Sequence, residues 1–202
     1  MSKHKHRHKH GSKHKNNSFE IVYEDCGTGR TLISLVRRKS DGKLLIWKRE
    51  RYKGSRSKNF YKTDIKKTKM WRKFGISIVK AWLHPDKKSV LRTYIAGHTL
   101  AEVLENNQEF FSGGETEYRT ALIAFIKLLI DSRHYIHDMK GANLVFDGER
   151  WQVIDSGKAY KQKSRSDTIH EYRENLREKW SRNLRSQNEI NYLESFLNEY
   201  CI

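Results

Sequence analysis

The segment Tyr135–Lys158, YIHDMKGANLVFDGERWQVIDSGK, sets three polar residues, Asp138, Asn143 and Asp155, around two short apolar runs. The runs NLVFD and WQVIDS flank the turn residues DGER, and this pattern predicts a β-hairpin. Any polar residue keeps a loop soluble, so an acid, an amide and a second acid at this spacing indicate a more specific task. We therefore expect a loop and a hairpin that present these three side chains together.

The chain before this segment predicts a small sheet with one helix. Three strand-like runs are joined by turns that contain glycine, and KSDGK is a strong hairpin signal. Residues 57–75 carry apolar side chains at helical spacing, and Gly75 ends the helix. Residues 76–84 and 89–97 predict two further strands. The first three strand-like runs are 19–25, 31–38 and 43–52.

From residue 97 onward the pattern favours helices. The ranges 99–106 and 115–135 have helical periodicity, and two amphipathic helices follow from about Ser166. The chain therefore predicts an α+β fold with a β-rich part over 19–96 and a mainly helical part over 97–202.

The composition points to an anionic partner. The formal net charge is +17, which favours nucleic acid, a nucleotide, an acidic glycolipid or a membrane surface. Residues 1–18 alternate His with Lys or Arg and cannot bury a core, so we expect a separate disordered arm. Such an arm can bind a metal or an anion, or can be a solvated tail without a defined task.

Cysteine usage and hydropathy indicate where the chain works. Cys26 and Cys201 show neither metal-ligand spacing nor a disulfide framework, which favours a reducing cytoplasm. The most apolar run, residues 121–130, contains Lys127 and predicts a core helix rather than a membrane span. The basic N-terminus lacks the apolar stretch of a secretory signal. We expect a cytoplasmic, monomeric protein.

Phosphoryl transfer is a chemistry that suits the opening segment. It requires bound metal ions, held phosphates and a carboxylate that orients the attacking hydroxyl group. Carboxylate and amide oxygens are ligands that Mg²⁺ accepts. The residues HDMKGAN, 137–143, resemble the catalytic loop of protein kinases, and VIDSG, 153–157, resembles their metal-binding Asp-Phe-Gly motif.

The N-terminal part resembles the same family independently. Residues 27–48 resemble the glycine-rich hairpin and the strand that ends in the ATP-binding lysine. In this resemblance Gly27 and Gly29 let the backbone approach the phosphates of ATP, and Lys48 pairs with their charge. Ordinary hairpin glycines and an edge lysine are the alternative interpretation.

The motif TYIAGHTL, 93–100, resembles the kinase hinge. The resemblance implies that main-chain groups near Tyr94 and Ile95 meet the adenine ring. It covers residues 19–160, with the motifs in the order of the family. It implies a two-lobe kinase-like fold, in which a five-stranded antiparallel sheet and one helix form the N-lobe.

The resemblance also assigns roles to the opening segment. Asp138 orients the acceptor hydroxyl, and Lys140 offsets charge on the transferred phosphoryl group. Asn143 and Asp155 hold Mg²⁺. Turn or capping roles for Asp138 and Asn143, and a solvated role for Lys140, are the alternatives.

The sequence departs from the family at several positions. Leu32 lies near the place of the third loop glycine, the His-Arg-Asp triplet is Ile-His-Asp at 136–138, and Ser156 replaces the phenylalanine. The helix glutamate that pairs with the lysine is absent. Asp64 is the only acid in that helix and is the candidate partner of Lys48.

Only residues 158–202 follow the metal motif, without an Ala-Pro-Glu sequence, so we do not expect a full protein-kinase C-lobe. Residues 153–174 resemble the tail of bacterial lipopolysaccharide core kinases of the heptose-kinase type. This resemblance implies ATP-dependent phosphorylation of a sugar hydroxyl by an enzyme at the inner membrane surface, where lysines favour binding.

Two other functions remain open from the sequence. A minimal Ser/Thr protein kinase of effector type would act on a protein acceptor. A pseudokinase would use the basic surface to bind nucleic acid or anionic lipid. The presence of Lys48, Asp138, Asn143 and Asp155 together favours an active enzyme.

Overall fold

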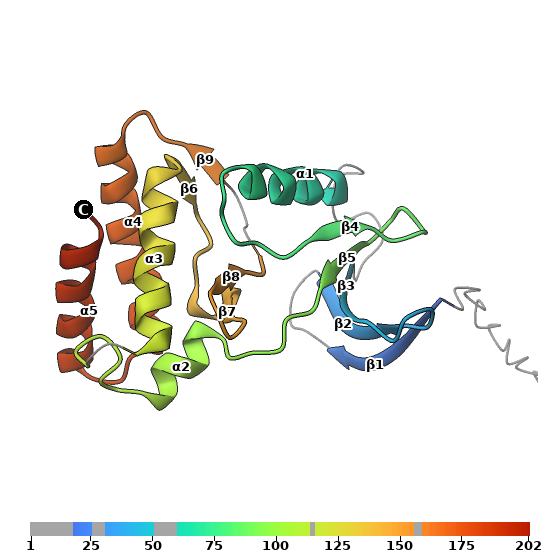
Figure 1. Cartoon of the computed structure of the whole chain (residues 1–202), viewed down its shortest axis with the longest axis horizontal. Coiled ribbons are helices and arrows are strands. Elements are labelled where there is room, and N and C mark those ends of the chain that lie inside the picture. Colours follow the sequence, from blue (N-terminus) through green and yellow to red (C-terminus); the bar gives the residue numbers. More distant parts are fainter. Residues whose placement is uncertain (1–17, 26–30, 51–59, 114–115, 156–158) are drawn as a thin grey trace, which may run out of the picture.

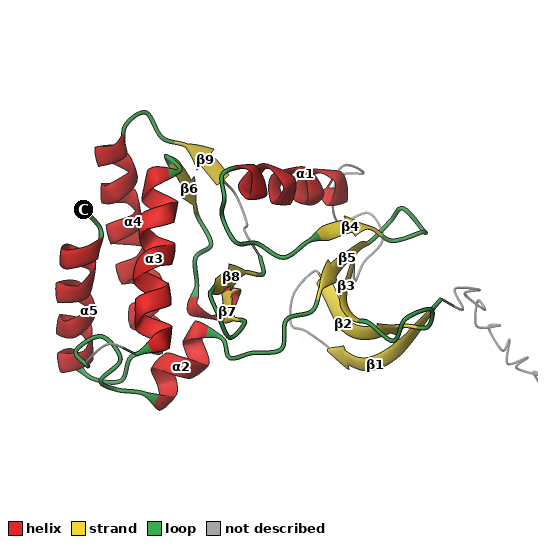
Figure 2. Cartoon of the chain, in the orientation of Figure 1, coloured by secondary structure: helices red, strands yellow, loops and turns green. Residues whose placement is uncertain are grey.

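A five-stranded antiparallel sheet forms one end of the protein, and helices form the other (Figure 1). The computed structural model describes residues 18–25, 31–50, 60–113, 116–155 and 159–202. Figure 2 shows the large sheet with one helix beside it, and the remaining helices together with several short strands, which confirms the expected α+β class.

The sheet has the strand order β1-β2-β3-β5-β4, and every neighbouring pair is antiparallel. The five strands predicted from hydrophobic alternation are therefore confirmed, and the last two are shorter than their apolar runs. The strands are β1 (Phe19–Asp25), β2 (Thr31–Arg38), β3 (Leu44–Glu50), β4 (Ala81–Leu83) and β5 (Val90–Thr93).

The register of β3 and β5 decides which side chains share a face of the sheet. Ile46 lies opposite Arg92, and Lys48 lies opposite Val90. Because directly opposed residues point to the same side, both cations project from one face. The other face buries a small apolar cluster of Val36, Leu45 and Leu91.

Helix α1 (Phe60–Lys73) packs against the face that carries the two cations (Figure 1). Tyr61 on the helix is buried with Ala81 on β4 and Val90 on β5. The predicted helix over 57–75 is confirmed for residues 60–73, and Gly75 follows it with a positive φ of 77°.

The second half of the chain contains four α-helices and two small sheets among its described residues. The helices are α2 (Leu100–Asn106), α3 (Glu117–Asp131), α4 (Arg165–Trp180) and α5 (Gln187–Tyr200). One small sheet pairs β6 (His134–Ile136) with β9 (Ala159–Lys161), and the other pairs β7 (Leu144–Phe146) with β8 (Trp151–Val153). Two short 3-10 helices are η1 (Gly141–Asn143) and η2 (Ser181–Asn183).

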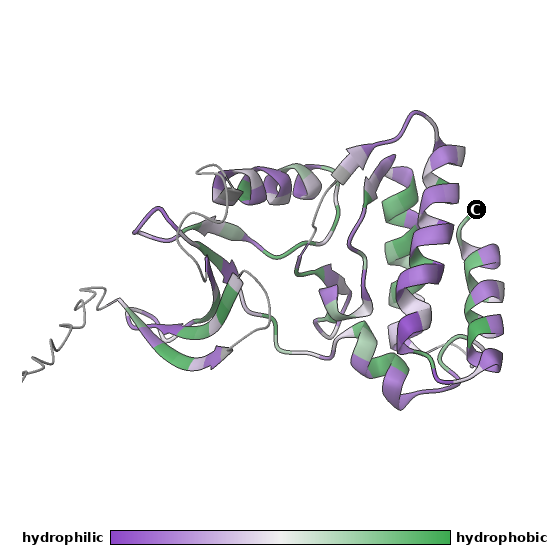
Figure 3. Ribbon diagram, turned by 180° about the vertical axis from the view of Figure 1, so that it is seen from behind, coloured by the Kyte–Doolittle hydropathy of each residue, from purple (hydrophilic) through white to green (hydrophobic). Residues whose placement is uncertain are grey.

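Helix α3 is the centre of the main hydrophobic core. Its side chains Leu122, Phe125, Ile126 and Leu129 are buried, as the apolar spacing of this helix requires. Helices α4 and α5 pack beside it, and the side of α4 away from α3 is largely hydrophilic (Figure 3). In the described part of the chain no helix is long and apolar enough to cross a membrane.

The β7–β8 hairpin joins the two halves of the molecule and confirms the hairpin predicted from the opening segment. The amide of Val153 donates to the carbonyl of Ser77 at 2.9 Å, and the amide of Val79 donates to the carbonyl of Val153 at 3.1 Å. On the other strand, the amide of Phe146 donates to the carbonyl of His98 at 3.0 Å. The hairpin is thus bonded to the segment between α1 and β4 on one strand and to the connection from β5 to α2 on the other.

The helix predicted over 115–135 is shorter than expected, and the β6–β9 pair was not predicted. Helix α3 ends at Asp131, and Arg133 adopts a left-handed conformation with φ 51°. This backbone reversal turns the next residues into β6. Side-chain hydrogen bonds from α4 then hold the strand, and such distant partners leave no local signal in the sequence.

Tyr172 on α4 is the main anchor of β6. Its hydroxyl group donates to the carbonyl of His134 at 2.8 Å and accepts from the amide of Ile136 at 3.1 Å. We predict that Tyr172→Phe lowers the free energy of unfolding by about 1–3 kcal/mol, because a buried amide and carbonyl lose their partner. Urea unfolding measures this change.

The matched control is Tyr192→Phe, because Tyr192 is 43% exposed. This substitution should leave the unfolding midpoint unchanged. Equal stability of the two variants would contradict the anchoring role of Tyr172.

Candidate functional site

A cavity of about 410 Å³ lies between the five-stranded sheet and the β7–β8 hairpin. The connection from β5 to α2 closes one side of it. Its lining residues are Ile33, Ile46, Lys48, Val79, Arg92, Thr93, Tyr94, Ile95, Gly97, Thr99, Glu102, Ala142, Asn143, Val145, Ile154 and Asp155.

The cavity has two apolar walls that face each other. Ile33 and Ile46 come from the sheet, while Val145 and Ile154 come from the hairpin and the residues after it. Facing aliphatic side chains suit a flat apolar group. Burial of apolar surface between such walls favours the binding of a group of this kind.

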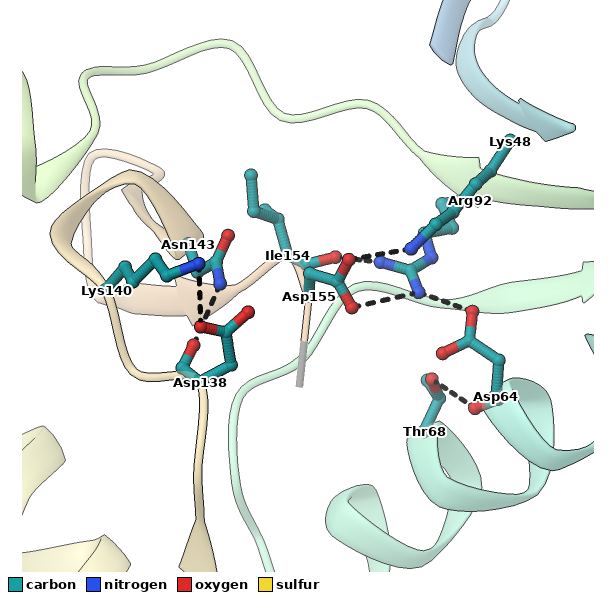
Figure 4. A network of polar contacts seen from close by, with 9 residues as sticks. All are labelled: Lys48, Asp64, Thr68, Arg92, Asp138, Lys140, Asn143, Ile154 and Asp155. Carbon is teal, nitrogen blue, oxygen red and sulfur yellow. Dashed lines mark hydrogen bonds and ion pairs between the residues drawn. The ribbon is translucent and has the colours of Figure 1, made fainter. Parts of the chain in front are cut away.

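Charged and polar groups gather on the lining beside these walls. Lys48 places its Nζ 2.7 Å from Oδ2 of Asp155, and only 10% of the lysine side chain is exposed, compared with 37% for Asp155 (Figure 4). The sheet register places the lysine on the cavity side, and the chain after β8 brings the carboxylate to meet it.

Arg92 extends this contact toward helix α1 (Figure 4). One guanidinium nitrogen, Nη2, lies 2.5 Å from Oδ2 of Asp64 and 3.6 Å from Oδ1 of Asp155. The other terminal nitrogen, Nη1, donates to the carbonyl of Ile154. Arg92 therefore joins β5, α1 and the residues after β8.

The charge of Arg92 is balanced by its surroundings. Burial alone lowers the pKa of the Arg92 guanidinium, but the charges of Asp155 and Asp64 raise it by more, so this pKa lies above its ordinary value. The guanidinium consequently stays protonated although only 7% of the side chain is exposed.

The loop between β6 and β7 carries the remaining polar residues of the opening segment (Figure 4). Lys140 Nζ lies 3.1 Å from Oδ1 of Asp138, and both side chains reach solvent. Asn143 donates from Nδ2 to the backbone carbonyl of Asp138 at 2.8 Å. That hydrogen bond orients the amide and leaves its Oδ1 as the acceptor atom.

The loop is fixed from two sides. The indole Nε1 of Trp180 donates to the carbonyl of Met139 at 2.9 Å, so α4 holds the loop from one side. On the other side, a Cβ added at Gly141 would lie 2.9 Å from the backbone nitrogen of Ala101 in α2. Only glycine allows this close approach without displacing the helix.

The structure brings several predicted site residues together. Lys48, Tyr94, Ile95, Asn143 and Asp155 all line the cavity. These residues come from the sheet, the connection after β5, and both flanks of the hairpin, so two residues of the opening segment, Asn143 and Asp155, share the cavity with Lys48.

Other predicted site residues lie elsewhere. Asp138 and Lys140 pair with each other on the loop and are not among the lining residues. Asp64 differs from the expectation, because the carboxylate pairs with Arg92 and Lys48 pairs with Asp155 instead. Gly27 and Gly29 lie outside the described residues.

Sequence reasoning missed Arg92, the most buried cation of the site. The available signal was a lone cation in the otherwise apolar strand VLRT. A charge inside a buried strand needs a partner, and a carboxylate on the neighbouring helix, Asp64, was present to provide one.

The donor set of the cavity fits Mg²⁺ better than a transition metal. Among the described residues no three His, Cys, Asp or Glu side chains form a cluster, so a closed protein cage for a metal is absent from this part of the chain. Two carboxylates line the cavity, and Glu102 already accepts hydrogen bonds from the amide and the hydroxyl of Thr99. Asp155 and the amide oxygen of Asn143 are the other oxygen ligands that the cavity offers. Mg²⁺ is commonly held by one or two such oxygens, with water and phosphate oxygens as its other ligands.

No model of a known protein family matches the chain, and no curated protein matches it either. The interpretation of the cavity therefore depends on the motifs in the sequence and on the geometry of these side chains.

Gly97 offers a test of the cavity's geometry. A Cβ at this position would lie 1.9 Å from the carbonyl oxygen of Phe146 in β7. We predict that Gly97→Ala forces the connection that carries Tyr94 and Ile95 away from the hairpin, and lowers the free energy of unfolding by about 1–3 kcal/mol. Urea unfolding measures the loss.

The control for this substitution is Ala96→Ser, which enlarges the exposed neighbouring side chain. It should unfold at the same urea concentration as the parent protein. A Gly97→Ala variant of undiminished stability would show that the close approach is not needed.

Proposed function

We propose that this chain is an ATP- and Mg²⁺-dependent phosphotransferase with a protein-kinase-like fold. The observation that carries the proposal is a single cavity that combines facing aliphatic walls with Lys48, Asn143 and Asp155 on its lining. These three residues are those that the motif resemblance had selected from the sequence.

The aliphatic walls are the proposed site of the adenine ring. Ile33 and Val145 come from opposite sides of the cavity and would pack on the two faces of the ring. Backbone groups near Tyr94 and Ile95 would provide the hydrogen bonds that select adenine. A volume of about 410 Å³ is within the range of small-molecule sites.

The charged groups are the proposed site of the phosphates. Lys48 would pair with the phosphate oxygens, and Asp155 with Asn143 Oδ1 would hold Mg²⁺. Bound Mg²⁺ would offset the negative charge of the phosphates. Lys48 Nζ and Asp155 Oδ2 lie 2.7 Å apart, so the proposed phosphate-binding and metal-binding groups are held side by side.

The loop residues are the proposed site of the acceptor. The side chain of Asp138 is 33% exposed and would accept the proton of an acceptor hydroxyl group. The oxygen of that hydroxyl group would at the same time form a bond to the terminal phosphorus of ATP. The bond from that phosphorus to its bridging oxygen then breaks and ADP leaves. Lys140, now paired with Asp138, would offset charge on the moving group.

The acceptor that fits the chain best is a sugar hydroxyl of lipopolysaccharide core. The formal charge of +17 suits an anionic glycolipid at a membrane surface. Helix α1 adds to this argument, since its one acid, Asp64, pairs inward with Arg92 while its outer cations are exposed. Those exposed cations are Lys62, Lys66, Lys69, Arg72 and Lys73.

A binding module for anionic partners is the second candidate function. The same exposed cations of α1 favour it, because a cationic face binds anionic lipid or nucleic acid without any catalysis. Nucleotide binding that requires Mg²⁺ separates the two functions.

We predict that ATP with Mg²⁺ raises the melting temperature of the protein and that ATP with EDTA raises it far less. At 100 times the dissociation constant, a ligand adds about 2.7 kcal/mol of stability. Asp155→Asn should remove the Mg²⁺-dependent part, because it removes the carboxylate charge. Asp131→Asn, at a position whose side chain is 65% exposed, is the matched control.

We predict that γ-labelled ATP transfers its label to purified lipopolysaccharide core. Asp138→Asn should reduce the rate by about 100-fold or more, the usual effect of a lost general base. Label on a generic protein instead would promote the Ser/Thr kinase alternative. If Mg²⁺ changed neither the melting temperature with ATP nor the transfer of label, and the protein bound lipid or nucleic acid in a salt-sensitive way, the proposal of an enzyme would be refuted. The binding module would then be favoured.

A further inference from the structure

Arg92 occupies the junction of three elements. It extends from β5, and its terminal nitrogens contact Asp64 on α1, the carbonyl of Ile154 and the carboxylate of Asp155 (Figure 4). The exposed fractions of the Arg92 and Asp64 side chains are 7% and 10%, so this ion pair is almost entirely removed from water.

The buried Arg92 contacts fix the relative orientation of their partners more strongly than a surface ion pair would. The guanidinium is planar and its donors have a fixed geometry, so two of them can engage two separate acceptors only in one orientation. Removing Arg92 leaves Asp64 buried without this cation, and removing Asp64 leaves the guanidinium with Asp155 as its remaining carboxylate. The network therefore constrains the relative positions of α1, β5 and the residues after β8.

The cations near Asp155 differ in what they can do when a ligand enters. Lys48 contacts Oδ2 of Asp155 and has a flexible side chain that can turn from the carboxylate toward a phosphate. Arg92 is held by Asp64 and by the Ile154 carbonyl, so it stays in place if Asp155 takes another ligand. Arg92 can thus keep the backbone before Asp155 in position.

We propose that Arg92 is a positioning residue that holds Asp155 for metal binding and ties α1 to the cavity. In this chain the Arg92–Asp64 pair takes the place of the lysine–glutamate pair that the kinase resemblance leads one to expect. The inference rests on the proposed function, because it concerns the same metal site.

The first test needs no ligand. Hydrogen exchange of the α1 backbone amides is compared in wild-type protein, Arg92→Met and Asp64→Asn. Both variants should exchange faster by about tenfold or more, since a hydrogen bond to a charged group is lost. Arg37→Met, a substitution of an arginine on β2 whose side chain is 49% exposed, should exchange like wild type.

A compensating pair of substitutions separates the contact from general damage. Arg92→Lys shortens the cation, while Asp64→Glu lengthens the acid by one methylene group. The single variants should exchange faster than wild type along α1, and the double variant should return toward the wild-type rate. Additive effects of the two substitutions would contradict a direct tie.

The second test addresses the metal. The Mg²⁺ concentration that gives half-maximal binding of a fluorescent ATP analogue should rise about tenfold or more in Arg92→Met, as for other residues that orient a metal ligand. Binding of the same analogue in EDTA should change little. Asp64→Asn retains the Arg92 contact with Ile154, so its Mg²⁺ midpoint should move less.

The outcomes distinguish this inference from the proposed function. If Arg92→Met had the wild-type Mg²⁺ midpoint and the wild-type exchange rates, the role of Arg92 would be overturned and the proposed function would be unaffected. Absence of Mg²⁺-dependent binding in the wild-type protein would overturn the proposed function and the metal-positioning role with it. In either case, the exchange rates of the α1 amides test whether Arg92 holds helix α1 against the sheet.

Discussion

Arg92 carries its positive charge into the protein interior, where 7% of its side chain is exposed, and a buried charge requires nearby partners. Asp64 supplies one partner from α1, and the chain after β8 supplies Ile154 and Asp155. If Asp64 or Asp155 moved away, the guanidinium would lose part of the negative charge that balances it in a medium of low dielectric. The sheet, the helix against it and the hairpin of the second half are thereby held in one arrangement. The cavity lies where they meet.

The β7–β8 hairpin connects the sheet region with the helical region through main-chain hydrogen bonds. It is hydrogen-bonded to Ser77 and Val79 on one side and to His98 on the other, so the segment before β4 and the connection from β5 to α2 both run along it. Asn143 precedes the hairpin and Asp155 follows it, and the pairing of β7 with β8 brings these distant positions to one cavity. The proposed metal site therefore needs no long side chains to reach across a gap. It follows from the geometry of a short hairpin.

Much of the fold could be predicted from local patterns, whereas several contacts could not. Alternating apolar residues predicted the five strands, and the DGER turn predicted the hairpin because both signals lie within a few residues. The β6–β9 pair was missed, since β6 is held by the Tyr172 hydroxyl from a distant helix. The partner of Asp64 was also missed. The carboxylate pairs with Arg92 through a register of β3 and β5 that no single stretch of sequence specifies.

A crystal structure with a non-hydrolysable ATP analogue and Mn²⁺, which gives an anomalous signal, would locate the nucleotide and the metal together. If Asp155 and Asn143 hold the metal, its peak should lie about 2 Å from an oxygen of Asp155 and from Oδ1 of Asn143. The adenine ring should lie between Ile33 and Val145, with Lys48 turned toward the phosphates. An analogue bound outside this cavity, or a metal without Asp155 among its ligands, would contradict the proposed site.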